Sequence, residues 1–72
     1  MRLSDVQPGQ SARILSLAAL DAPMRRKLMV MGLLPHSEVR FIRSAPLGDP
    51  LQITTGGITL SMQKALAAQI EV

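Results

Sequence analysis

A pair of glycines between two alternating apolar segments constrains the fold of this chain most strongly. Leu51–Thr55 has an apolar or β-branched residue at every second position, and so does Ile58–Met62. Gly56-Gly57 separates the two segments. A two-residue hairpin turn needs positive φ, which glycine adopts at little steric cost. The sequence therefore predicts a β-hairpin over these residues.

Three more segments are expected as strands. Glu38–Ser44 alternates Val39 and Phe41 with charged residues, which is typical of a half-buried strand. Ser11–Leu17 also begins with alternation, but its second half is irregular and indicates a bulge. Ile70–Val72 is expected to add a last short strand.

One longer helix is expected between Asp21 and Gly32. Asp21 is a favourable N-cap residue, and Gly32 is typical of a helix end. Apolar residues recur at i, i+4 and i+7 on one face, at Met24, Leu28 and Met31. This face is expected to pack against the core.

Together these elements predict a mainly β fold with about five short strands, one internal α-helix and a short C-terminal helix within Gln63–Gln69. Strands this short leave many unpaired edges in an open sheet. A small SH3-like β-barrel is therefore the expected architecture. At 72 residues the chain is expected to be a single domain, residues 1–72.

The residues that carry catalysis or bind metals are few. The chain has no cysteine, one histidine and five acidic residues, which are scattered along it. His36 lies in a Pro-His-Ser turn without an identifiable acid–base partner. Ser61-Met62-Gln63-Lys64 matches the Ser-x-x-Lys pattern of certain serine enzymes, but we interpret Ser61 as the N-cap of the last helix. The sequence assigns no catalytic residue, no cofactor and no metal ligand, and we expect a protein that is not an enzyme.

The basic triplet Arg25-Arg26-Lys27 contributes much of the net charge of +3. It is expected in the first turns of its helix, where the helix macrodipole disfavours cations. Two interpretations stay open for this placement: a solvated charged face, and docking to an acidic partner. Nucleic-acid binding usually adds stacking aromatic rings, whereas Phe41 is the only aromatic residue and is expected in the core.

No apolar run approaches the ~20 residues that a membrane-spanning helix needs. The N-terminal residues also lack the apolar stretch of a signal peptide. We therefore expect neither a targeting segment nor insertion into a membrane.

The middle of the chain resembles the ferrous iron transport protein A (FeoA) family. The resemblance rests on Arg25–Leu28, on Met31–Pro35 and above all on the Ala-Pro-Leu-Gly-Asp-Pro loop, Ala45–Pro50. Two positions depart from the family pattern. Gln63 stands where the last helix often has arginine, and His36 stands where glycine is usual. If that position needs positive φ, His36 is strained by ~1 kcal/mol or adopts the left-handed region.

The resemblance implies an SH3-like barrel and a cytoplasmic, non-enzymatic accessory protein of bacterial ferrous iron (Fe2+) uptake. It also implies a partner, the cytosolic domain of the GTP-binding ferrous iron permease (FeoB), which such a protein would bind and modulate. Two alternatives stay open: a small basic nucleic-acid-binding module associated with translation, and a weak transition-metal-binding regulatory domain. Self-association also stays open.

We expect one partner-binding surface made by the helix Met24–Met31, the turn Gly32–His36 and the loop Ala45–Pro50. Within it, the candidate contact residues are Arg25, Arg26, Leu33, Leu34 and Leu47. The arginines would form a charged rim around the leucines. Each leucine is interpreted either as an exposed apolar anchor or as part of the core.

Overall fold

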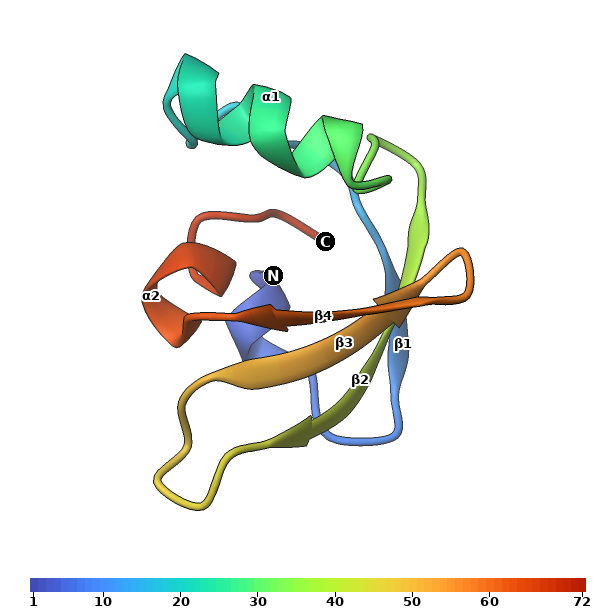
Figure 1. The fold of residues 1–72 in the computed structure, drawn as a ribbon, viewed down its shortest axis with the longest axis vertical. Coiled ribbons are helices and arrows are strands. Elements are labelled where there is room, and N and C mark those ends of the chain that lie inside the picture. Colours follow the sequence, from blue (N-terminus) through green and yellow to red (C-terminus); the bar gives the residue numbers. More distant parts are fainter.

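The computed structural model describes residues 1–72. Three strands form where the alternation predicts them, at Glu38–Ser44 (β2), Leu51–Thr55 (β3) and Ile58–Met62 (β4). With Ser11–Arg13 (β1) they make one antiparallel sheet of four strands in the order β1-β2-β3-β4. The sheet curls around the core (Figure 1). The mainly β class is confirmed.

The predicted hairpin joins β3 to β4. Thr55 pairs with Ile58 across the turn, and φ is +56° at Gly56 and +82° at Gly57. Positive φ at both positions is the requirement of a tight hairpin turn. The hydroxyl of Thr55 donates a hydrogen bond of 3.1 Å to the carbonyl of Glu38, which ties the hairpin to the start of β2.

A bulge is present, but in β2 and not in the first strand. The β2–β3 register shifts between Phe41 and Arg43, which leaves Ile42 as the extra residue. A bulge bends its strand and increases the local twist, so it helps this short sheet to wrap around its core. The expected strand over Ser11–Leu17 ends earlier, at Arg13.

The C-terminal segment replaces the expected fifth strand. Ile70–Val72 is not a strand, because only Glu71 forms bridges, to Arg2 and to Ser16. The N–H of Leu15 donates to the carbonyl of Glu71 at 2.8 Å, and the N–H of Glu71 donates to the carbonyl of Ser16 at 3.1 Å. Glu71 thus pairs with one residue on each side, Arg2 and Ser16, which is too short for a strand ladder. These bridges still join both ends of the chain to the body of the fold.

Three helical segments complete the fold: the 3-10 turn Leu3–Asp5 (η1), the helix Ala22–Val30 (α1) and the short helix Lys64–Ala67 (α2). Asp21 is the N-cap of α1, as predicted, and its Oδ1 accepts a hydrogen bond of 2.9 Å from the N–H of Met24. None of these helical segments has the length and apolar character of a membrane-spanning helix.

The end of α1 follows the Schellman pattern. Gly32 has a φ of +101°, and the N–H of Leu33 donates to the carbonyl of Leu28 at 3.0 Å. In this motif the residue after the glycine commonly packs on the residue whose carbonyl it binds. Leu28 and Leu33 are both buried. Gly32 therefore ends α1, as predicted, and also turns the chain back onto the core.

One hydrophobic cluster holds the elements together. Its fifteen buried members are Leu3, Val6, Ile14, Leu17, Leu20, Leu28, Leu33, Val39, Phe41, Leu51, Ile53, Leu60, Met62, Ala67 and Ile70. Phe41 belongs to this cluster, as expected, so no aromatic ring is available on the surface for stacking.

Candidate partner-binding surface

Helix α1 is attached to the body of the protein through one face. Leu28 is its only buried residue, and Met24 and Met31 pack, partly buried, against the core. This is the face that the apolar spacing predicts. Figure 1 shows α1 lying across one end of the molecule, so its opposite face is left to solvent.

The opposite face of α1 carries apolar side chains that the sequence analysis did not select. Val30 is 83% exposed and Met29 is 39% exposed. A helix turns by about 100° per residue, which places Arg26 and Val30 opposite Leu28 and places Ala22 and Met29 about 100–120° around the helix from it. The helical periodicity that identified the buried face could therefore have identified this face as well. Ala22, Arg26, Met29 and Val30 are called the outer face of α1 below.

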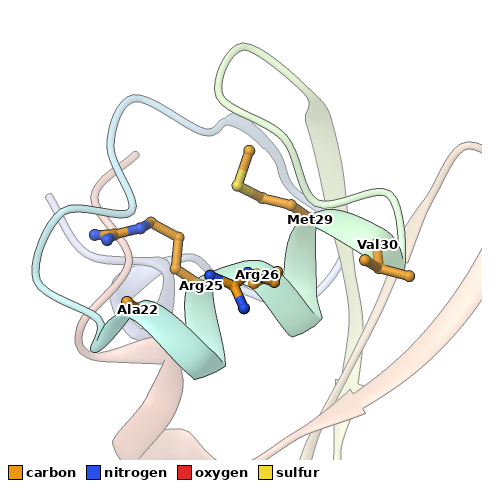
Figure 2. A pocket seen from close by; sticks show the side chains of 5 residues that line it. All are labelled: Ala22, Arg25, Arg26, Met29 and Val30. Carbon is orange, nitrogen blue, oxygen red and sulfur yellow. The ribbon is translucent and has the colours of Figure 1, made fainter.

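Two shallow hollows lie one on each side of Arg26 and Val30, which line both of them. The remaining lining residues of the first hollow are Ala22, Arg25 and Met29. Those of the second are Pro23, Lys27 and Met31. Figure 2 shows the side chains around the first hollow, where Arg25 and Met29 project from the same side of the helix. The surface is a low ridge with a shallow hollow on each side.

The basic triplet occupies positions four to six of the nine-residue helix α1. Because α1 spans Ala22–Val30, Arg25 comes three residues after its first position, and Lys27 lies in the last turn. Cations are favoured in a last turn, so the expected conflict with the macrodipole is absent for Lys27. Exposure is therefore the better argument for a binding role.

The three basic side chains differ in their contacts and in their exposure. Nη1 of Arg25 lies 3.5 Å from the carbonyl oxygen of Leu20, in a partly buried position. Arg26 and Lys27 are exposed. No acidic residue follows Asp21 in the helix, and the carboxylate of Asp21 caps the first turn. Arg26 and Lys27 thus present their charge to solvent.

Leu33 is not available to a partner. Its side chain has 0% exposure, because the Schellman turn at Gly32 folds it onto the core. Of its two interpretations, core packing is correct and the anchor is wrong. Its neighbour Leu34 is 44% exposed and stays a candidate.

The loop Ala45–Pro50 lies at the other end of the molecule from α1 (Figure 1). Leu47 in this loop is 96% exposed. Strand β2 runs between the turn that follows α1 and this loop, and its seven residues span about 20 Å at ~3.3 Å per residue. The prediction of a single continuous surface is therefore wrong. The end of the molecule that holds α1 contains Arg25, Arg26 and Leu34, whereas Leu47 lies at the opposite end.

A family model for the FeoA domain matches residues 1–72. The chain belongs to the FeoA family. Its fold agrees with solved members: the FeoA protein of Chlorobium tepidum superposes with a TM-score of 0.93 at 35% identity, over 99% of this chain and 67% of that one. Iron(II) transport protein A of Clostridium thermocellum gives 0.90 at 37% identity, over 99% of this chain and 43% of that one.

A third FeoA structure identifies the architecture. Stenotrophomonas maltophilia FeoA, complexed with zinc, matches with a TM-score of 0.78 at 29% identity, over 100% of this chain and 88% of that one. It is described as an SH3 domain protein possibly acting as a bacterial ferrous iron transport activating factor. The expected SH3-like fold is confirmed, and the chain belongs to a family associated with ferrous iron transport.

The departure from the FeoA pattern at His36 has a clear backbone consequence. His36 has a φ of +73°, so it adopts the left-handed region. Its N–H donates to the carbonyl of Ile14 at 2.7 Å, and its carbonyl accepts a hydrogen bond of 3.0 Å from Nη1 of Arg13. These contacts on both sides of the residue hold the unfavourable conformation in place.

The other departure, Gln63, is the N-cap of α2 but makes no capping hydrogen bond with its side chain. The expected cap, Ser61, lies in β4 instead, so that prediction is wrong. Oδ1 of Asp49 accepts a hydrogen bond of 2.9 Å from the N–H of Lys64. The carboxylate of the Ala45–Pro50 loop thus satisfies the start of α2.

No group of three or more histidine, cysteine or acidic side chains lies close enough together to hold a metal ion. His36, the only histidine, is exposed in its turn. The chemically distinctive surface of this FeoA domain is therefore the basic and apolar outer side of α1.

Proposed function

We propose that this chain is a cytoplasmic, non-enzymatic accessory protein of ferrous iron uptake, and that it binds and modulates the cytosolic domain of the GTP-binding ferrous iron permease (FeoB). Membership of the FeoA family supports the link to ferrous iron transport. The name given to the Stenotrophomonas maltophilia protein supports an accessory role, because it describes a possible activating factor.

One observation carries the binding role: the end of the molecule that holds α1 exposes apolar and basic side chains together. Val30 and Leu34 are exposed apolar residues there, and Arg26 and Lys27 are exposed bases. Interface centres combine apolar anchors with arginine, and a polar rim surrounds them. This end fits such an interface better than the loop end, where Leu47 is the main exposed apolar side chain.

The test is a calorimetric titration of the full chain with the purified cytosolic domain of the permease from the same organism. It is run with GDP, with a non-hydrolysable GTP analogue and without nucleotide. We expect saturable binding at tens of micromolar or tighter, which is typical of a transient interface of modest area. No binding under any of the three conditions would overturn the proposed function.

Two variants then locate the interface. Leu34→Ser removes an exposed apolar side chain beside α1, and Leu47→Ser makes the same change at the opposite end. If the α1 end is the contact surface, Leu34→Ser weakens binding and Leu47→Ser does not. The reverse result would move the interface to the Ala45–Pro50 loop.

A further inference from the structure

We propose that the outer face of α1 binds a single amphipathic helix of the partner, one with an apolar stripe flanked by carboxylates. This inference rests on the proposed function for the identity of the partner. It adds the chemistry and the secondary structure of the segment that is recognised. Shape, charge and apolar exposure on α1 each support it.

The shape of the outer face suits a helix. Ala22, Arg26 and Val30 follow one another at spacings of four residues, so their side chains form one ridge along α1. The two hollows lie on either side of this ridge. Helices pack by placing the ridges of one into the grooves of the other, and Ala22 leaves room for a close approach at one end of the ridge.

The charge of α1 selects an acidic partner. Arg25, Arg26 and Lys27 are consecutive, and α1 contains no acidic residue. Such a patch attracts a carboxylate-bearing segment and repels a basic one, which contributes more to specificity than to affinity. Two copies of α1 would bring two basic triplets together, so a second copy of this chain is a poor occupant.

The apolar part of the outer face favours a protein helix over a lipid surface. Val30 and Met29 are the large exposed apolar residues of this nine-residue helix. A helix that anchors at a membrane interface has a large apolar face. A flexible methionine beside a protruding valine is instead suited to packing against side chains of a partner.

The inference is tested by nitrogen-15 NMR of the labelled full chain with two designed helical peptides of about 20 residues, long enough to hold a helix. Both carry leucines at i, i+3, i+4 and i+7; one has glutamates beside the stripe and the other has lysines. We expect the glutamate peptide to shift the amides of α1 in a saturable way. The lysine peptide should bind at least about tenfold more weakly.

Variants are then compared with the glutamate peptide and with the permease domain. Arg26→Glu reverses an exposed charge in the outer face, and Val30→Asp removes its apolar anchor. Each is expected to weaken both interactions about tenfold or more. Arg40→Glu is the matched control, because Arg40 is exposed on β2, away from α1. Unchanged amide shifts outside α1 show that the variants are folded.

The outcomes separate this inference from the proposed function. If the permease domain binds and Arg26→Glu and Val30→Asp bind it like the original chain, the inference is overturned and the proposed function stands. If only the glutamate peptide binds at α1, the partner is wrong and the inference stands. Equal binding of both peptides, or binding to phosphatidylglycerol vesicles without binding to either peptide, overturns the inference.

Discussion

The side-chain carboxylate of Asp49 caps the backbone of Lys64, since its Oδ1 lies 2.9 Å from the Lys64 nitrogen. The contact joins the Ala45–Pro50 loop to the first residue of α2. An orphan N–H at a helix start needs such an acceptor. The Ala-Pro-Leu-Gly-Asp-Pro loop, on which the FeoA resemblance mainly rests, thus has a structural role at the end of the molecule away from α1.

Removing this cap should destabilise the protein. We expect Asp49→Ala to lower the free energy of unfolding by about 0.5–2 kcal/mol, the usual range for loss of a capping side chain. Asp49→Asn keeps an acceptor oxygen, so it should lose less. Urea denaturation of the three proteins measures both effects, and faster hydrogen exchange at the Lys64 amide should accompany the alanine change. Equal stability of all three would contradict the capping role.

The left-handed backbone of His36 predicts an order of stability among substitutions. Glycine reaches a φ of +73° without strain, and asparagine tolerates this region better than other side chains do. A β-branched residue is strongly disfavoured there. We expect His36→Gly to gain up to about 1 kcal/mol, His36→Asn to be near neutral, and His36→Val to lose about 1–2 kcal/mol.

Thermal unfolding followed by circular dichroism checks this order. A destabilised glycine variant together with an unaffected valine variant would show that the position relaxes to negative φ in solution. Pro35→Ala is a useful control for changes in the same turn, because Pro35 is exposed.

Core truncation should be severe in a domain this small. Ile53 is fully buried in β3, and replacing a buried isoleucine by alanine costs about 2–5 kcal/mol. A core of this size provides only about 3–5 kcal/mol of net stability. We therefore expect Ile53→Ala to be largely unfolded at room temperature, whereas Ile53→Val should lose only about 0.5–1.5 kcal/mol.

Ile58 provides the matched control for the core prediction, because it lies in the same hairpin and is half exposed. Ile58→Val should change the free energy of unfolding by no more than about 0.5 kcal/mol. Urea midpoints measure Ile53→Val and Ile58→Val, and circular dichroism without urea shows whether Ile53→Ala is folded. A folded and stable Ile53→Ala variant would mean that the core of β3 and β4 contributes less than its burial indicates.

The leucines of the expected surface should now behave differently from one another. Leu33→Ala should cost about 2–5 kcal/mol, because Leu33 is fully buried at the end of α1. Leu34→Ala and Leu47→Ala should stay within about 0.5 kcal/mol. Chemical denaturation measures the three differences. A small loss for Leu33→Ala would contradict its place in the core.

Local rules explain the parts of the fold that were predictable. The glycine pair favours a turn with positive φ. The alternation on both sides of it then sets the strand register, because only one register places the apolar residues of both strands on the same face. Asp21 and Gly32 marked the ends of α1 through capping and a left-handed residue. These features depend on a few neighbouring residues, so reading the sequence was enough.

The site was less predictable, because exposure depends on contacts between distant residues. Leu33 and Leu34 are adjacent and chemically identical, yet one is buried and one is exposed. The Schellman turn at Gly32 decides which leucine turns inward. The apolar spacing of α1 marks its buried face, and the same helical period places the exposed Val30 on the opposite side.

By itself, the sequence determined the β-hairpin, the strand Glu38–Ser44 and the capped helix, because each follows from local backbone preferences. Only the tertiary structure separated α1 from the Ala45–Pro50 loop by the length of β2. Only the tertiary structure also shows that Asp49 caps α2, and that the expected last strand consists only of the bridges of Glu71. Those outcomes require segments far apart in the chain to meet, and no local pattern encodes where they do.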